Sequence, residues 1–172
     1  MKLRRLEEFD APFMLEWMHD DDVIKYLNAN FKSKTLDDCV AFIKASNQSK
    51  TDLHLAIADD ENCYMGTVSL KNIDSKYRCA EFAITIRKCA MGKGFSKFAI
   101  RKIVEIAFEE LGLHTVYLNV YSENVKAIKC YEKCGFRNVL FDELKELYGN
   151  REKPCEKYPL LWFRIDKQGM SK

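Results

Sequence analysis

The loop Gly92-Lys93-Gly94 is the first place in the sequence where residue types and spacing indicate chemistry. An alternating run that ends at Ile86 precedes it, and a stretch of helical spacing begins at Phe95 directly after it. Glycines let backbone N–H groups approach a ligand closely, and the N-terminus of a helix carries a partial positive charge. We therefore expect this strand, loop and helix to form an anion site whose ligand carries phosphate.

Cationic residues surround the same loop, at Arg87, Lys88, Lys93 and Lys97. The helix dipole disfavours cations at a helix N-terminus, so their presence makes more sense if an anion lies among them. The loop has neither the third glycine of a dinucleotide-binding G-x-G-x-x-G nor the spacing of a P-loop. Neither of these two common phosphate-binding folds is therefore indicated.

A second motif follows, with Asn124 after an expected strand and Tyr131-Glu132-Lys133-Cys134-Gly135-Phe136 at the end of an expected helix. The two motifs together resemble the GNAT superfamily of acetyl-CoA-dependent N-acetyltransferases, closest to its ribosomal-protein alanine and polyamine acetyltransferase branch. The resemblance is strong over residues 81–136 and weaker across most of the chain. The family's pyrophosphate loop is usually Gln/Arg-x-x-Gly-x-Gly/Ala, and Met91 and Ser96 depart from it at the first and last positions. A loop that binds through its backbone tolerates both departures.

The resemblance implies an α+β fold with a mixed, mostly antiparallel central sheet and helices on both faces. The strands over 81–87 and 115–121 are implied to be parallel neighbours around the acetyl-CoA site, joined by a right-handed crossover. Acetyl-CoA is implied as cosubstrate, with no metal. The residues implied to contact it lie on the strand, the loop and the second motif: Ile84, Thr85, Ile86, Met91, Gly92, Lys93, Gly94, Phe95, Ser96, Lys97, Asn124 and Tyr131.

Acetyl transfer to an amine needs a base for the amine, a donor to the carbonyl oxygen and an acid for the leaving thiolate. Tyr131 resembles the family's general acid, since a phenol of reference pKa about 10 can protonate a thiolate of comparable basicity. Glu81 begins the strand implied to line the acetyl group and is the candidate base, with His19 or water as alternatives. His54 and His114 are expected to be structural.

Seven cysteines occur, at positions 39, 63, 79, 89, 130, 134 and 155. With no C-x-x-C and no nearby His, they indicate neither zinc nor a disulfide framework, and small buried hydrophobes in a reducing compartment are expected. We expect direct transfer in a ternary complex. An acyl-enzyme through Cys89 or Cys130 stays open, although neither has a paired His in the sequence.

Local signals also place the N-terminal elements. A weak strand over 2–6 precedes a helix over 11–18, with Asp10 as its N-cap and Pro12 in its first turn. A short helical turn begins at the acids 20–22. Thr35 is expected to cap a helix over 36–46, whose core face is expected to consist of Leu36, Val40, Ala41 and Ile43.

Three alternating runs, 52–58, 64–73 and 78–87, predict an antiparallel meander because their connections are short. The helix after the glycine loop is expected to turn five apolar residues to the core: Phe98, Ile103, Ile106, Ala107 and Leu111. Residues 137–148 have helical spacing, whereas the resemblance implies a strand broken by a turn at 149–150. A late strand over 158–165 contains Pro159 near its start.

The chain of 172 residues is most simply one N-acetyltransferase domain, 1–172, long enough to bury a core without disulfides or metal. Lys plus Arg number 28 against 26 Asp plus Glu, and the formal charge of +2 makes no case for nucleic acid. No apolar run reaches the roughly 20 residues of a membrane span, and the N-terminus lacks a signal-peptide core. A cytoplasmic protein is expected, and a homo-oligomer stays open.

The acceptor is expected to be the primary amine of a small molecule, with a polyamine favoured, or a peptide N-terminus. Between Leu6 and Ile24 there is no Lys or Arg but there are seven acids: Glu7, Glu8, Asp10, Glu16, Asp20, Asp21 and Asp22. This acidic arm is either a solvated face or a rim that attracts cations. Two other classes stay open, a non-catalytic acyl-CoA-binding regulatory module and a nucleotide-binding regulator.

Overall fold

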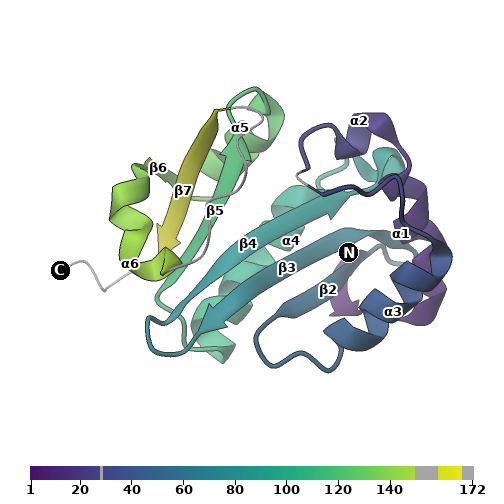
Figure 1. Ribbon diagram of the computed structural model, residues 1–172, viewed down its shortest axis with the longest axis horizontal. Helices are drawn as coiled ribbons and strands as arrows, with labels where there is room; N and C mark the ends of the chain where they lie inside the picture. The colour runs from purple at the N-terminus through teal and green to yellow at the C-terminus, as the bar shows by residue number, and fades with distance from the viewer. Residues whose placement is uncertain (28, 150–158, 168–172) are drawn as a thin grey trace.

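Seven strands form one sheet, in the order β1-β2-β3-β4-β5-β7-β6, in the computed structural model, which describes residues 1–27, 29–149 and 159–167 (Figure 1). Their bounds are β1 (Lys2–Arg5), β2 (Leu53–Ala58), β3 (Tyr64–Asp74), β4 (Cys79–Ile86), β5 (Thr115–Tyr121), β6 (Arg137–Val139) and β7 (Leu160–Asp166). Neighbouring strands pair antiparallel, except that β4 and β5 are parallel. The expected class, with a mostly antiparallel sheet and one parallel pair, is confirmed.

The parallel strands β4 and β5 pair over a short stretch and then separate. Their register joins Cys79 to Thr115, Ala80 to Val116 and Glu81 to Tyr117. Residues 82–86 of β4 keep their partners on β3 but have none on β5 within the described chain. The ribbons of the two strands diverge accordingly in Figure 1. The backbone groups along this free edge of β4 are therefore available to a ligand.

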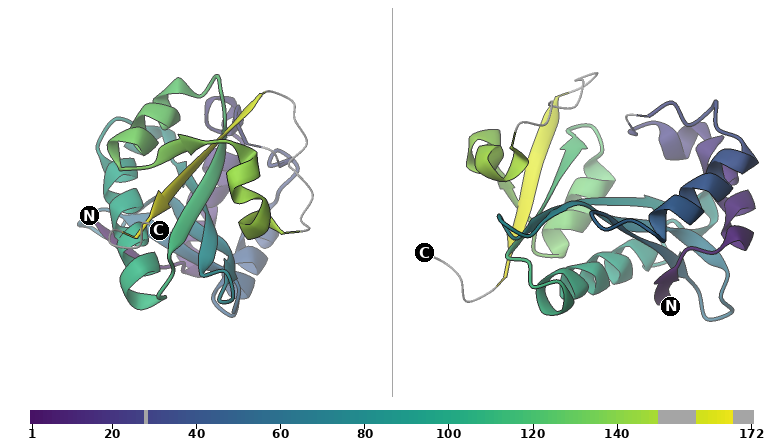
Figure 2. Two further views of the ribbon diagram at one scale, coloured as in Figure 1. Left: turned by 90° about the vertical axis from the view of Figure 1, so that its left-hand side faces the viewer. Right: turned by 60° about the horizontal axis from the view of Figure 1, so that its bottom comes forward.

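Helices cover both faces of the sheet, as Figure 2 shows. Their bounds are α1 (Ala11–Met18), α2 (Asp21–Ile24), α3 (Leu36–Ser46), α4 (Phe95–Glu105), α5 (Val125–Lys133) and α6 (Lys145–Tyr148). A π-helical turn, η3 (Ile106–Glu110), extends α4, and three short 3-10 turns are η1 (Glu8–Asp10), η2 (Lys88–Ala90) and η4 (Phe141–Leu144). The predicted cap of α3 is confirmed, because the Thr35 side chain accepts a bond from the Asp38 N–H.

Alternation along the strands divides the side chains between two main cores. Phe82 and Ile86 of β4 belong to the core that α4 and α5 cover, together with Ile103 and Leu118. On the other face, α1 and α3 cover a second core around Trp17, Ile43, Ala56 and Tyr64. Because successive strand residues face opposite ways, Glu81 and Thr85 lie on this second face of the sheet.

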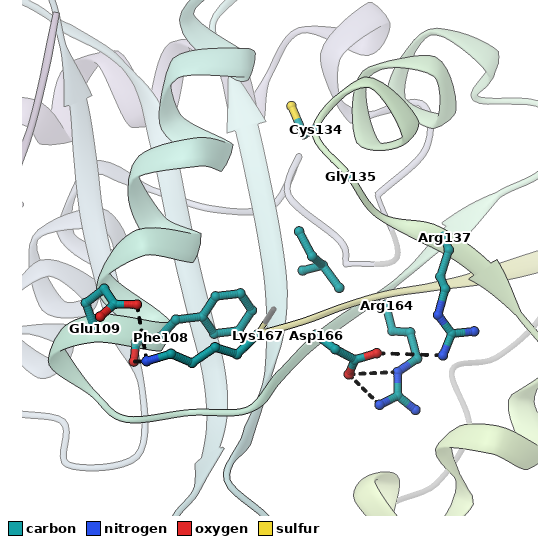
Figure 3. Close-up of a pocket in the computed structure, with 9 residues that line it drawn as sticks. Phe108, Glu109, Cys134, Gly135, Arg137, Arg164, Asp166 and Lys167 are labelled. Atoms are coloured by element: carbon teal, nitrogen blue, oxygen red, sulfur yellow. Dashed lines mark hydrogen bonds and ion pairs between the residues drawn. The ribbon is translucent and has the colours of Figure 1, made fainter. Parts of the chain in front are cut away.

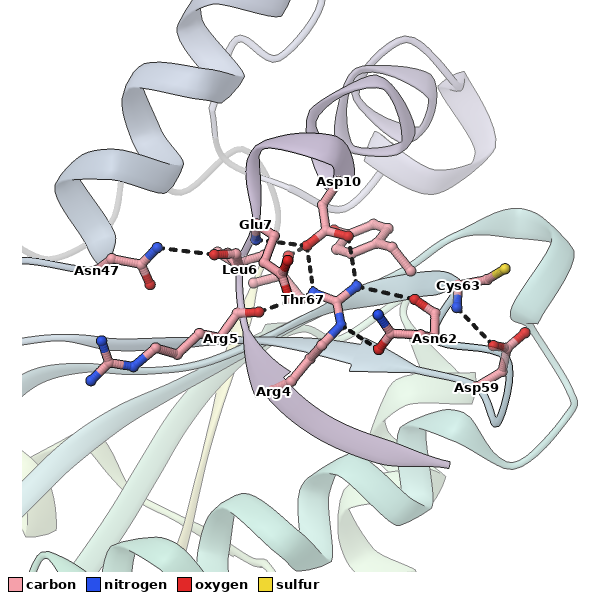
Figure 4. Close-up of polar contacts among 11 residues, drawn as sticks. Arg4, Arg5, Leu6, Glu7, Asp10, Asn47, Asp59, Asn62, Cys63 and Thr67 are labelled. Atoms are coloured by element: carbon pink, nitrogen blue, oxygen red, sulfur yellow. Dashed lines mark hydrogen bonds and ion pairs between the residues drawn. The ribbon is translucent and has the colours of Figure 1, made fainter.

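The Asp10 side chain has a different role from the predicted N-cap. It makes no cap bond to α1; its carboxylate instead accepts two bonds from the Arg4 guanidinium, both 2.7 Å, and one from the Glu7 N–H (Figure 4). Asp10 is fully buried, and Asn62 also accepts from Arg4. Since breaking a buried pair leaves an uncompensated charge, this pair ties β1 to α1, and its loss would cost about 3–5 kcal/mol.

The predicted core faces of two helices are partly wrong. In α3, the prediction is confirmed for Ile43, which is buried, while Val40 is half-buried and Leu36 and Ala41 are exposed. Cys39, which was not predicted, is also buried, with its thiol against the Met18 sulfur. In the long helix, Leu111 is exposed, Phe98 and Ile106 are half-buried, and the buried residues are Phe95, Ala99, Ile100, Ile103 and Ala107. The spacing changes because the helix widens into a π turn at residue 106.

The segment over 137–148 contains both a strand, as the resemblance implied, and helical turns, as its spacing predicted. Arg137–Val139 is a strand that pairs with β7, and the helical spacing after it produces η4 and α6. The late strand is confirmed as Leu160–Asp166, directly after Pro159. Asn150, Cys155 and Tyr158, which the sequence predictions included, lie outside the described residues.

Candidate active site

The glycine loop presents free backbone donors at the start of α4. Gly92 and Gly94 have φ angles of +75° and +88°, a region that favours glycine, and Gly94 is the N-cap of the helix. The first helical bond is donated by Phe98 to the Gly94 carbonyl. The N–H groups of residues 94–97 therefore have no partner within the described chain, and α4 has no acid in its first turn. This is the geometry of an anion site.

Only part of the expected cationic cluster faces this loop. Lys93 and Lys97 form no ion pair among the residues described, whereas Arg87 pairs with Glu16 at 2.6 Å and Lys88 with Asp22 at 2.6 Å. The prediction that all four cations serve the loop is therefore wrong for two of them. The helix supplies a replacement that the sequence reading missed, Arg101, one turn beyond Lys97.

A hollow of about 360 Å³ lies along the exposed face of the same helix start. It is lined by Gly94, Lys97, Phe98, Arg101 and Lys102. Lys102 is paired with Glu105 at 2.8 Å, so Lys97 and Arg101 give this surface its positive charge, which suits further phosphate groups beside the loop. The four-residue spacing from Lys97 to Arg101 puts both side chains on one face of the helix, and this signal could have identified Arg101 from the sequence.

Residues 84–86, expected to line the cosubstrate, occupy the half of β4 that has left β5. Thr85 lies opposite Thr67, and Ile86 lies opposite Gly66. A Cβ at Gly66 would come within 2.3 Å of the Thr85 carbonyl oxygen, so glycine is what lets β3 approach here. The free edge of β4 and the unpaired N–H groups at the start of α4 are thus close in sequence, because only η2 and the glycine loop separate the strand from the helix.

Tyr131 lies on α5 against this same strand. Its ring is edge-on to that of Phe82, with centroids 5.9 Å apart, and it also contacts Phe136 and Phe163. Its hydroxyl has no hydrogen-bond partner among the described residues. Burial raises the pKa of the Tyr131 phenol well above its ordinary value. The phenol therefore stays protonated at neutral pH and has a proton to donate.

Asn124 is the N-cap of α5, and its side chain accepts a bond from the Ala127 N–H at 3.4 Å. The predicted capping role is confirmed, and a contact to the cosubstrate stays a prediction.

Glu81 occupies the last paired position before β4 and β5 separate. Its side chain is 14% exposed, so it does not simply face solvent at the end of the strand. Lys71 donates to Oε1 at 3.2 Å and Asn72 donates to Oε2 at 3.1 Å. Neither residue was singled out from the sequence. Counting back from the turn at 74–76 in a regular register would put Asn72 opposite Glu81, and only the register shift between Lys71 and Asp74 puts Lys71 there.

The histidines and cysteines offer weaker alternatives. His19 is exposed, with its ring bonded to the Lys34 carbonyl oxygen. His54 is bonded to Ser69 at 2.7 Å, and burial lowers its pKa. Burial raises the pKa of the Cys130 thiol, which makes it a poor nucleophile. Cys89 is exposed. His114 has a buried Nε2 without a partner in the described structure and lies in the turn before β5.

A larger hollow, of about 580 Å³, lies away from these residues, where α5 and β7 end (Figure 3). Its charged residues satisfy one another, since Asp166 lies between Arg137 and Arg164 and Lys167 pairs with Glu109. It brings together none of the predicted site residues. It is therefore not the candidate active site.

The acidic arm is largely neutralised. Asp10 pairs with Arg4, Glu8 with Lys44, Glu16 with Arg87, Asp21 with Lys32, and both Asp20 and Asp22 with Lys88. Within the described chain, five cations thus face six of the seven acids. These pairs weaken the alternative of a rim that attracts cations, because the partners lie outside the arm, where a local charge count does not include them.

Two searches of the described residues gave negative results. No group of three or more His, Cys, Asp or Glu side chains is arranged to hold a metal ion. No helix there has both the length and the apolar character to cross a membrane.

Comparison with known proteins agrees with the geometry. The model of the acetyltransferase (GNAT) domain matches residues 1–137. Spermidine N(1)-acetyltransferase of Vibrio cholerae is 29% identical over 136 residues, or 79% of this chain and 78% of that protein. The Escherichia coli K12 enzyme of the same name is 31% identical over 143 residues, covering 79% and 72%.

A solved structure of a spermidine N-acetyltransferase is also similar to this chain. Spermidine N-acetyltransferase from Vibrio cholerae, in complex with CoA and spermine, matches with a TM-score of 0.79 at 25% identity, over 96% of this chain and 94% of that one. These relatives are enzymes, which sets aside the non-catalytic acyl-CoA module and the nucleotide-binding regulator. The chain belongs to the GNAT acetyltransferase family and is an acetyl-CoA-dependent N-acetyltransferase.

Proposed function

We propose that this enzyme transfers acetyl directly to a primary amine of a polyamine such as spermidine. The observation that carries the acceptor class is the similarity to spermidine acetyltransferases over about four-fifths of the chain. The acidic arm adds little support, because its charges are mostly paired. A peptide N-terminus is the competing acceptor.

The residues present fit acetyl-CoA. The N–H groups of residues 94–97, with Lys93 and Lys97, would hold its pyrophosphate, and Arg101 would add charge alongside. The free edge of β4 at Ile84, Thr85 and Ile86 would bond its amide-bearing arm. Asn124, Met91 and Ser96 complete the proposed contacts. When bound, the cosubstrate supplies the acetyl thioester.

Glu81 and Tyr131 divide the proton transfers in this proposal. The Glu81 carboxylate takes the proton of the acceptor amine, directly or through water, so that the nitrogen can attack the thioester carbonyl. Tyr131 gives its proton to the leaving thiolate, because its phenol is protonated at neutral pH and its hydroxyl is uncommitted. Glu81 is the last residue of β4 that pairs with β5, and Tyr131 on α5 contacts Phe82, the next residue of β4.

Direct transfer is favoured over an acyl-enzyme. An acyl-enzyme needs a thiolate, and burial raises the pKa of the Cys130 thiol. The exposed Cys89 has no imidazole partner in the described structure. The amine and the thioester must therefore be bound at the same time.

The test is an acceptor panel with detection of released CoA thiol. Spermidine and spermine are compared with a basic peptide that has a free N-terminus and with a neutral amino sugar. The expected result is the highest kcat/KM for a polyamine, with intersecting initial-rate lines. If the peptide or the sugar is the best acceptor, the polyamine proposal is wrong, and parallel lines would overturn direct transfer.

A further inference from the structure

The strand opposite Glu81 contains an irregularity at this point. The β3–β4 register runs through Lys71 opposite Glu81 and then shifts, so that Asp74 lies opposite Cys79. Two residues of β3, Asn72 and Ile73, thus face a single residue of β4, Ala80, as in a β-bulge. Bulges re-aim side chains and are common beside active sites.

Asn72 has an unusual backbone at this bulge. Its φ is +51°, in the left-handed region that non-glycine residues rarely occupy. Its N–H is bonded to the Asp52 carboxylate at 2.8 Å, which fixes the residue from the start of β2. In this position the Asn72 side-chain amide reaches Glu81 Oε2 at 3.1 Å. A regular strand would send the side chain of residue 72 to the opposite face from Lys71.

The two donors act on different oxygens of one carboxylate. Lys71 Nζ donates to Oε1 and Asn72 Nδ2 donates to Oε2, so the Glu81 carboxylate is held at both oxygens. Donors on both oxygens restrict the rotation of the carboxylate. Such a carboxylate is oriented before an acceptor arrives.

We propose that Lys71 and Asn72 are positioning residues, which orient the Glu81 carboxylate for its work as the base. The inference rests on the proposed function of Glu81. Neither residue needs to touch the acceptor, because each acts through the carboxylate. The bulge is the structural device that brings both side chains to the same carboxylate.

Other charged groups around Glu81 must be separated from this effect. Asp52 and His54 lie on or beside β2, and Tyr117 is the partner of Glu81 on β5. Arg164 is the β7 partner of Tyr117 and is itself held by Asp166. Lys71 also acts electrostatically on His54, so a change at Lys71 also affects this imidazole. The test therefore uses a background without this imidazole.

The first variant is Asn72→Gly, with Asn72→Asp beside it. Glycine keeps the left-handed backbone and the N–H bond to Asp52 but removes the amide, so the fold is retained. We expect kcat to fall about tenfold or more while KM for both substrates stays within about threefold, since misorientation affects the chemical step. Asn72→Asp keeps the shape but replaces the amide donor with a second carboxylate beside Glu81, and should lower kcat at least as much.

The second variant is Lys71→Met in a His54→Gln background, compared with that background alone. Loss of the ammonium frees Oε1 of the Glu81 carboxylate, so kcat should fall about tenfold or more while KM for both substrates stays within about threefold. Lys76→Met is the matched control, because Lys76 is an exposed lysine of the same hairpin that contacts Tyr77, and it should leave kcat unchanged.

Glu81→Gln separates the two proposals. If Glu81→Gln keeps parent turnover and the parent pH profile, then Glu81 is not the base and both proposals fail. If Glu81→Gln is inactive while Asn72→Gly and Lys71→Met keep the parent kcat, the base role stands and the positioning role is overturned. A loss of stability in these two variants without a change in kcat also overturns the positioning role, since a purely structural contact would produce that result.

Discussion

At the scale of single residues, the most informative group is the hydroxyl of Tyr131. It lies in an aromatic environment formed by Phe82, Phe136 and Phe163, without a hydrogen-bond partner in the described structure. The Tyr131 ring is buried, but its hydroxyl oxygen is not among the buried polar atoms that lack a partner, so it is accessible to a ligand. A hydroxyl that makes no hydrogen bond within the described structure adds little to folding. Its presence is therefore better explained by catalysis than by stability.

Replacing this hydroxyl tests the explanation. Tyr131→Phe should lower kcat by about 100-fold, the scale of a lost general acid, and leave CoA affinity and the urea midpoint unchanged or slightly improved. Tyr77→Phe, at an exposed tyrosine, is the control for the chemical change. Parent turnover in Tyr131→Phe between about pH 6 and 9 would rule out the acid role.

At the scale of elements, the start of α4 joins two local properties, a left-handed glycine and unpaired N–H groups. The added Cβ of Gly94→Ala would have open space, with only the Met1 side chain at 4.0 Å. The effect of the substitution must therefore come from the backbone, which is strained at φ +88° for any L side chain.

Gly94→Ala should weaken CoA binding about tenfold or more, because the loop must change conformation to relieve the strain, and its donors then no longer converge. Isothermal titration with CoA measures this. Gly149→Ala is the matched control, since Gly149 also has positive φ, at +65°, and an added Cβ that meets nothing within 4 Å. Equal CoA affinity in Gly94→Ala and the parent would show that the phosphate loop is elsewhere.

At the scale of the whole molecule, charge is distributed in pairs that join distant segments. The ion pairs of Arg87 with Glu16 and of Lys88 with Asp20 and Asp22 connect η2 and its preceding residue to α1 and α2. The formal net charge is +2. A cationic acceptor therefore meets a weak long-range field, although its binding site can still contain acids.

The salt dependence of the reaction should accordingly be shallow. Raising ionic strength from about 0.01 M to 0.15 M should lower kcat/KM for spermidine by less than about threefold, because steering needs unpaired charge within the Debye length. Initial rates at low substrate measure this, with a monoamine for comparison. A tenfold loss for spermidine alone would show that the acidic arm steers the acceptor in spite of its ion pairs.

Local physics made several features readable from the sequence. Positive φ at Gly92 and Gly94, the Thr35 cap and the alternation along β4 depend on residues within a few positions of each other. Such signals predicted the strand, loop and helix of the anion site, and the resemblance of two motifs then identified the family. For the same reason, Tyr131 and Glu81 could be named as candidates before their surroundings were known.

Only the tertiary structure decided the partners of the charged and buried groups. Asp10 was read as a helix cap, yet it pairs with Arg4 because β1 passes beneath α1. Lys88 was assigned to the phosphate loop, yet it pairs with Asp22 across a long stretch of sequence. The separation of β4 from β5 after Glu81 and the bulge that turns Asn72 toward it are likewise results of sheet packing. Sequence spacing determines what a segment can form, but the lowest free energy of the packed chain determines which distant groups meet.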